Sequence, residues 1–156
     1  MYSSEYGNID IVDRFLSSNK CNIHIQDNLG WTVLFYAACS GNLEIFNKLI
    51  LHGSDIHHIG KTGKNLFHIT AQLGNIKMVD NISSFNLDIN HQDNMGWTPL
   101  MFAVDERDEK MTEYFLKQGA DLTIKDNFGK TALGIVQDDE VENLLKEYLI
   151  NFVLPQ

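Results

Sequence analysis

Apolar side chains recur three and four positions apart in short stretches of this sequence, and polar residues separate the stretches. Ile45, Leu49 and Ile50 show the spacing, which returns around Met78 and around Met111. Positions spaced in this way lie on one face of an α-helix, because a helix turns once in about 3.6 residues. The pattern therefore predicts a series of short amphipathic helices, and Gly-Asn pairs before two of them supply N-caps.

A second kind of helix is predicted after each polar turn. Gly96 supplies a turn conformation that other residues resist, Thr98 is a suitable N-cap, and Pro99 fits the first helical position. Asn65 replaces the threonine in one copy and keeps its capping chemistry. Small residues such as Ala103 would let these helices approach their neighbours closely. Each unit is therefore expected to hold one turn and two short helices.

The turn and the helix start recur at a fixed interval. The copies read DNLGWTVL at 27–34, GKTGKNLF at 60–67, DNMGWTPL at 93–100 and DNFGKTAL at 126–133. Their central glycines are 33 residues apart each time. Self-similarity at one period indicates a solenoid, in which each unit buries its apolar face against the next.

The chain resembles the ankyrin-repeat family in the stretches TPLMFA at 98–103 and GADL at 119–122 and in their counterparts. The resemblance covers nearly the whole chain. It implies a single all-α domain, an ankyrin-type solenoid of stacked helix-turn-helix units with projecting β-turns or hairpins. The implied units are a partial N-terminal repeat at 1–26, full repeats at 27–59, 60–92 and 93–125, and a shortened C-terminal capping repeat at 126–156.

Two stretches depart from the repeat pattern. Arg107 stands where Gly41 and Gly74 stand in the preceding units, which predicts a strained or altered loop at 105–108. The stretch 83–87 has no helix-ending glycine, so we expect the third repeat to be less regular than the others.

The first repeat begins partway through its opening helix. The sequence is therefore expected to be either a fragment of a longer array or a protein with an unusually small N-terminal cap. The apolar residues Ile9, Val12 and Phe15 would be poorly covered in either case. We expect a monomer, or weak self-association through this end.

The net charge of −9 is unevenly distributed. Residues 1–78 hold six basic and six acidic side chains, whereas residues 79–156 hold six basic and fifteen acidic ones. Such a surface disfavours nucleic acid and anionic membranes. The acidic half either aids solubility or docks a basic surface of a partner protein.

The sequence also bears on the compartment. It has only two cysteines, no basic leader followed by an apolar run, and no stretch approaching the roughly 20 apolar residues that cross a bilayer. We therefore expect a cytoplasmic protein, with the nucleus as the alternative.

Nucleotide binding is disfavoured. The tripeptide Gly-Lys-Thr occurs at 60–62 and at 129–131, as at the end of a phosphate-binding loop. The loop also needs an earlier glycine, and Asp55 or Ile124 occupies that position here. The repeat pattern already accounts for both tripeptides as turns.

A zinc site is disfavoured too. His58 and His91 are repeat equivalents, which stacking would place about 8–10 Å apart, too far to share one ion directly. They and His57 are interpreted as exposed turn residues, and His68 is predicted to form internal hydrogen bonds. The carboxylates between 105 and 109 are interpreted as a solvated face, and no catalytic motif is present. The sequence predicts no catalytic residue, metal or cofactor.

The remaining signal is a set of large side chains in turns that should be polar. By the resemblance, these side chains flank the turn tips and face the concave binding side, together with the ends of the first helices. Met95 and Phe128 have no evident internal role, whereas Trp31 and Trp97 could instead stiffen the stacked turns. The predicted protein-binding residues are Leu29, Trp31, Cys39, Ser40, Thr62, Lys64, Gln72, Leu73, Met95, Trp97, Asp105, Glu106, Phe128 and Lys130.

The leading hypothesis is a non-catalytic protein-interaction module that binds an unidentified partner protein through the concave face and the turn tips. One alternative is a regulatory or substrate-recruiting array that belongs to a larger protein or enzyme. Another is a small inhibitor that masks a basic surface of its partner, as ankyrin-type inhibitors of Rel transcription factors do.

Overall fold

The computed structural model describes residues 12–18 and 22–153, which form helices joined by loops without any strand among them. Residues 12–17 are helical. No helix in this part of the chain is long and apolar enough to cross a membrane. The subsequent helices are α2 (Val33–Ser40), α3 (Leu43–Leu51), α4 (Leu66–Gln72), α5 (Ile76–Ser83), α6 (Pro99–Asp105), α7 (Glu109–Lys117), α8 (Ala132–Ile135), α9 (Asp139–Tyr148) and the π-helix η1 (Leu149–Val153).

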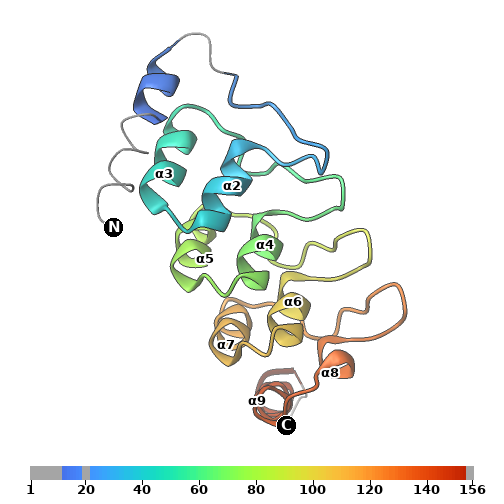
Figure 1. Cartoon of the computed structure of the whole chain (residues 1–156). Helices are drawn as coiled ribbons and strands as arrows, with labels where there is room; N and C mark the ends of the chain where they lie inside the picture. The colour runs from blue at the N-terminus through green and yellow to red at the C-terminus, as the bar shows by residue number, and fades with distance from the viewer. Residues whose placement is uncertain (1–11, 19–21, 154–156) are drawn as a thin grey trace.

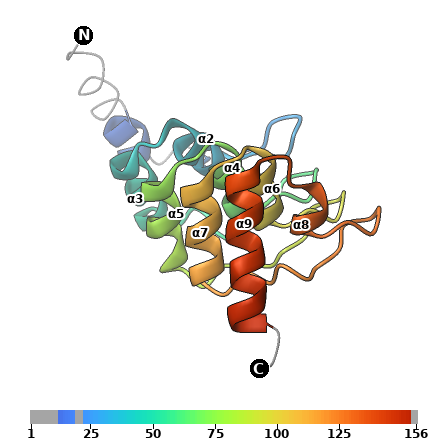
Figure 2. The same ribbon diagram turned by 90° about the horizontal axis from the view of Figure 1, so that it is seen from below.

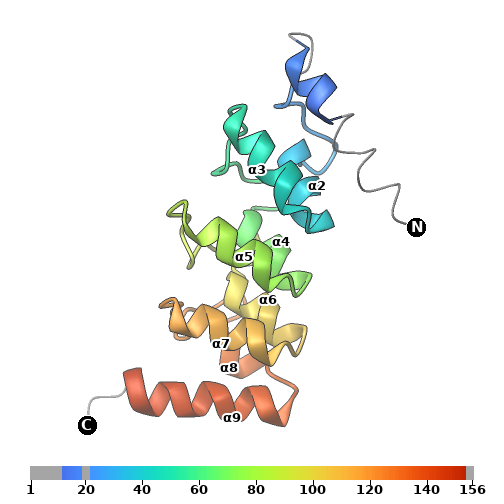
Figure 3. The same cartoon turned by 90° about the vertical axis from the view of Figure 1, so that its left-hand side faces the viewer.

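The helices form two parallel rows. Helices α2, α4, α6 and α8 make the first row, and α3, α5, α7 and α9 make the second row beside it (Figure 1). Helix α4 contacts α2 and α6, and α7 contacts α5 and α9. The long loops project beyond the first row (Figure 2), and the second row covers the opposite side (Figure 3). This arrangement confirms the predicted all-α solenoid, while the predicted repeat boundaries stay a prediction.

One core runs through the stack. Leu49, Ile82 and Phe115 occupy equivalent positions of α3, α5 and α7, and each is at most 2% exposed. They belong to a single cluster of buried side chains that both rows contribute to. Burying one such side chain stabilises the fold by about 1.5–3 kcal/mol. Because the buried faces lie between units, each unit depends on its neighbours.

The predicted caps begin the helices. The Thr98 hydroxyl accepts a hydrogen bond from the Met101 amide (3.3 Å), and the Asn65 side chain accepts one from the amide three residues later (3.2 Å). Asn42 and Asn75 cap α3 and α5 in the same way. These bonds satisfy amides that have no partner within the helix.

The two departures from the pattern carry backbone strain. Among the described residues, Asn86 and Arg107 alone combine a side chain with positive φ, at 55° and 57°. Arg107 has the positive φ that Gly41 and Gly74 have at the equivalent positions, so the loop is strained rather than altered. Asn86 makes no bond equivalent to the one from the Gly53 amide to the Ile50 carbonyl (2.9 Å), so the third repeat is less regular here, as predicted.

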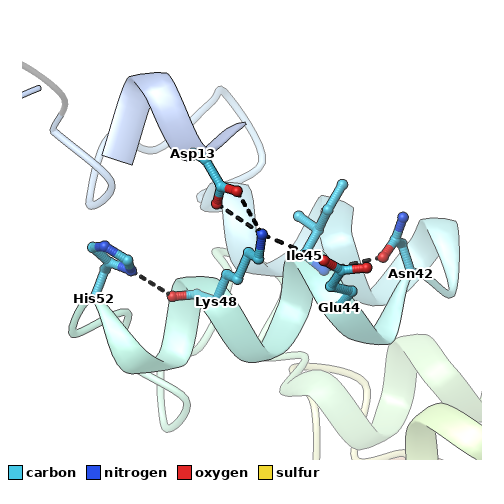
Figure 4. A network of polar contacts seen from close by, with 6 residues as sticks. All are labelled: Asp13, Asn42, Glu44, Ile45, Lys48 and His52. Carbon is cyan, nitrogen blue, oxygen red and sulfur yellow. Dashed lines mark hydrogen bonds and ion pairs between the residues drawn. The ribbon is translucent and has the colours of Figure 1, made fainter. Parts of the chain in front are cut away.

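The helix at 12–17 is joined to α3 by an ion pair. The Lys48 Nζ donates to both carboxylate oxygens of Asp13, at 2.8 and 2.6 Å, and lies 3.3 Å from the Glu44 carboxylate (Figure 4). The hydrogen bonds that Lys48 donates to Asp13 raise the pKa of the Lys48 amine. Of the residues expected to promote self-association, Phe15 is 61% exposed and Val12 is half-buried, while Ile9 lies outside the described residues.

Candidate functional site

Three of the four projecting turns are held by an aspartate at their start, and the turn at 60–64 begins with Gly60 instead. The Asp93 Oδ1 accepts hydrogen bonds from the amides of Met95 (2.8 Å) and Trp97 (2.9 Å). Asp27 and Asp126 make the same pair of bonds in their own turns. The aspartate therefore fixes the backbone from which the second and fourth residues after it project.

Successive turns are also bonded to one another. The Asn94 amide donates to the Thr62 carbonyl (3.0 Å), and the Asn127 amide donates to the Met95 carbonyl (3.1 Å). The Asn127 side chain adds a bond to the Asn94 carbonyl (2.9 Å). Gly96 has a φ of 80°, and a Cβ on it would lie 2.7 Å from the Asn127 amide nitrogen, so this contact requires glycine. The turns form a ladder that positions their side chains before any ligand arrives.

Two histidines belong to this ladder, which corrects their interpretation as exposed residues. The His58 Nε2 lies 2.6 Å from the Gly30 carbonyl oxygen, and the His91 Nε2 lies 2.9 Å from that of Gly63. Both rings are half-buried, because each reaches back to the turn that begins its own repeat. His57 is exposed, as predicted. No cluster that could hold a metal ion occurs among the described residues.

His68 is fully buried at the base of the turns. Its Nε2 donates to the Trp97 carbonyl oxygen (3.0 Å), and its Nδ1 accepts from the Asn65 amide (3.2 Å). This confirms the predicted internal hydrogen-bonding role. Burial lowers the pKa of the imidazole to about 4, so the ring is neutral at physiological pH. The ring centroid lies 5.6 Å from that of Phe102, so His68 supports this ring and the Trp97 backbone from below.

Three turns together with α6 and α8 enclose a hollow of about 710 Å³. Its volume lies within the range of roughly 300–1,000 Å³ that ligand-binding pockets occupy. We call this feature the turn hollow. It is lined by Lys61, Thr62, Lys64, Asp93, Asn94, Met95, Trp97, Phe102, Asp126, Phe128, Lys130 and Ile135.

The floor of the turn hollow is apolar. Trp97 is half-buried against Phe102, with the ring centroids 5.1 Å apart, and Phe102 is only 8% exposed. Met95 is 50% exposed and Phe128 is 71% exposed. The Lys64 Nζ lies 4.1 Å from the centre of the Phe102 ring, a cation–π contact at the edge of the floor.

Six of the predicted binding residues lie in this lining, two from each of three turns. They are Thr62, Lys64, Met95, Trp97, Phe128 and Lys130. Four others lie near the ends of α2 and α4, outside the lining. Of these four, Gln72 contacts a lining residue, because its Oε1 accepts a hydrogen bond from the Lys64 Nζ (3.0 Å). Burial raises the pKa of the Cys39 thiol. The predicted residues outside the lining are Leu29, Trp31, Cys39, Ser40, Gln72, Leu73, Asp105 and Glu106.

Trp31 packs against its own helix and the next turn. Its indole lies 5.6 Å from the Phe35 ring and 5.7 Å from the Tyr36 ring, measured between centroids. It also covers Gly60 of the next turn, where an added Cβ would come within 3.1 Å of the indole. The interpretation that it stiffens the stacked turns therefore fits the geometry, and Leu29 and Trp31 lie outside the lining of the turn hollow.

Phe102 and Ile135 are not among the binding residues predicted from the sequence. Both occupy the position after the histidine of the repeat motif, where Tyr36 and Ile69 stand in the earlier units. A large apolar residue at this position in successive units would have been a usable signal. The remaining unpredicted lining residues are Lys61, Asp93, Asn94 and Asp126.

The chain matches the family described as ankyrin repeats (3 copies) over residues 1–80 and 36–126. It is 30% identical over 59 residues to ankyrin repeat domain-containing protein 49 of Bos taurus, covering 38% of this chain and 25% of that protein. It is 35% identical over 63 residues to protein phosphatase 1 regulatory subunit 27 of Mus musculus, covering 40% of this chain and 41% of that protein. The aligned segments thus span less than half of either relative.

Proposed function

This chain belongs to the ankyrin-repeat family, whose members generally bind other proteins, and we propose that it is a non-catalytic module that binds a partner protein through its turn tips and first helices. In this proposal, as the resemblance to ankyrin repeats implies, these parts form the concave face of the solenoid. The observation that carries the proposal is the turn hollow, in which exposed apolar side chains project from a backbone held by hydrogen bonds.

Met95 and Phe128 are the central residues of this proposal. Both are large, at least half exposed and close enough to line one hollow. Such residues contribute strongly to protein interfaces when a partner buries them. The bonded turns reduce the conformational entropy that binding costs, because the aspartates and the ladder already fix the backbone. Trp97 adds apolar surface but also packs on Phe102, so its role is partly structural.

An affinity capture from native lysate tests the proposal. The bait is the intact chain, and the test variant carries Met95→Ala and Phe128→Ala. The control variant carries Leu51→Ala and Ile150→Ala, which removes two side chains exposed by 83% and 62% outside the turn hollow. A specific partner should be retained by the control and lost from the test variant. Equal capture by both variants would reject the turn hollow as the binding surface.

The relative named as a phosphatase regulatory subunit favours a second candidate, a regulatory array that recruits an enzyme or its substrate. In this proposal the module would act in a reducing compartment, the cytoplasm or the nucleus, as the cysteine content predicts. Recovery of an enzyme through the turn hollow in the same capture would support it, and recovery of proteins without catalytic domains would count against it.

The acidic half supports a third candidate, the masking of a basic surface. Asp105 and Glu106 are exposed at the end of α6, and Asp139 and Glu140 are exposed at the start of α9. Attraction between exposed charges is screened by salt, so binding of this kind should weaken steeply as ionic strength rises. A salt-independent affinity would exclude it.

A further inference from the structure

The turn hollow carries a charge opposite to that of the chain. Lys61, Lys64 and Lys130 surround its apolar floor, although the net charge of the whole sequence is −9. Within the described part of the chain none of these three lysines forms an ion pair. By contrast, Lys117 and Lys146 on the second row pair with carboxylates at 2.7 Å.

The two aspartates of the hollow do not offset these lysines fully. Asp93 and Asp126 are 8% and 7% exposed, and the Oδ1 of each accepts two amide hydrogen bonds from its own turn. Their carboxylates are therefore engaged in holding the backbone. An incoming segment meets mainly apolar side chains and lysine amines.

Lys64 is placed to receive an anion. Its Nζ is held between the Gln72 Oε1 (3.0 Å) and the Phe102 ring (4.1 Å), both of which are uncharged. Burial lowers the pKa of this amine, because desolvation disfavours its charged form and the Asp93 carboxylate offsets only part of that effect. A carboxylate beside it would replace part of the lost hydration. The side chain is already held in position, so the pair would form at a lower cost in rotamer entropy.

We propose that the turn hollow binds a segment of a partner protein that carries a large apolar side chain next to aspartate or glutamate. The apolar side chain packs between Met95 and Phe128 over the Trp97–Phe102 floor, and the neighbouring carboxylates pair with Lys64 and Lys130. A basic segment would face the amines of Lys64 and Lys130 and is rejected, which gives the site its selectivity. This inference rests on the proposed function and specifies the chemistry of the partner.

A selection from a random peptide library displayed on phage tests the inference with the full-length chain as the target. One variant carries Lys64→Gln and Lys130→Gln, which removes the charge but keeps most of the side-chain length. Its control carries Lys77→Gln and Lys110→Gln, the same change in net charge at exposed positions on the second row. A third variant, with Met95→Ser and Phe128→Ser, removes the apolar walls. Circular dichroism melting curves establish that each variant is folded.

The expected peptides combine a large apolar residue with adjacent acidic residues. Their affinity should fall on the order of tenfold with Lys64→Gln and Lys130→Gln, stay unchanged in the lysine control, and disappear in the serine variant. Peptides that need Met95 and Phe128 but show no acidic enrichment would overturn this inference and leave the proposed function standing. Peptides indifferent to Met95 and Phe128, or a selection without binders to the hollow, would count against the proposed function itself.

Discussion

The Nε2 of His68 lies 3.0 Å from the carbonyl oxygen of Trp97, so a buried imidazole in α4 holds the turn of the following repeat. The bond joins two units through a group that titrates. It also lies beneath the floor of the turn hollow, since Trp97 is one of the lining residues. The stability of the stack and the shape of the hollow are therefore linked through the protonation state of His68.

We predict that the free energy of unfolding falls as the pH is lowered from 7 to 5. The folded imidazole has a pKa of about 4, whereas the unfolded one titrates near its ordinary value of 6.5. Between these values the unfolded chain binds a proton that the folded chain does not, so acid favours unfolding. The contribution lost by pH 5 is about 2 kcal/mol.

Urea unfolding at several pH values measures this effect. His68→Met is the control, because Met101 occupies the equivalent position in the next unit. The difference in stability between the native chain and this variant cancels the titration of carboxylates that both share. A difference that stays constant from pH 7 to 5 would contradict the assigned role.

Arg107 stores backbone strain that a glycine would release. At a φ of 57° a side chain costs roughly 1–2 kcal/mol, part of which glycine returns through its greater freedom in the unfolded chain. We predict that Arg107→Gly is more stable than Arg107→Ala by about 1 kcal/mol. Both changes remove the bond from Arg107 to the Gln137 side chain (3.2 Å), so the comparison isolates the backbone. Equal thermal midpoints would show that position 107 is not strained.

The Asp93 carboxylate is predicted to be required for the backbone conformation of its turn. Asp93→Ala leaves the amides of Met95 and Trp97 without their acceptor and is expected to destabilise the fold by about 2 kcal/mol. Hydrogen exchange at both amides should accelerate more than exchange elsewhere. Asp105→Ala, at an exposed position, serves as the control. Unchanged exchange at Met95 would mean that the turn does not depend on the carboxylate.

Alanine substitutions at Trp31 and Met95 are predicted to differ in their effect on the stability of the fold. Trp31 packs on Phe35, Tyr36 and the next turn, so Trp31→Ala should cost about 2–3 kcal/mol. Met95→Ala should change stability by less than about 0.5 kcal/mol, because half of the side chain is exposed. Thermal melting of the two variants checks this difference. Similar losses of stability in both would make Met95 a structural residue.

The fold was predictable because its determinants are local and repeated. The glycine, the capping residue and the apolar positions recur every 33 residues, so each copy supports the interpretation of the others. Even the strain at Arg107 followed from the glycine missing there. The roles of His58 and His91 were misread, because their partners are carbonyl groups 28 residues earlier in the chain.

The candidate site was predictable only in part. The turn residues Met95 and Phe128 were identified because large apolar side chains are unusual there. The floor residue Phe102 lies in a helix, where an apolar residue is ordinarily assigned to the core. Trp31 and Trp97 both pack on their own helices, but Trp97 also lines the hollow. The difference depends on the neighbouring turn, because Gly60 and Lys61 beside Trp31 correspond to Asp126 and Asn127 beside Trp97. Such differences arise from packing between units.

The most direct test of the proposed binding surface is hydrogen exchange measured by mass spectrometry on the chain alone and in complex with its captured partner. We predict that the partner slows exchange in the turns at 93–97 and 126–130 and in α6, and leaves exchange in α5 and α7 of the second row unchanged. Protection confined to the second row, with exchange in these turns unaltered, would contradict it.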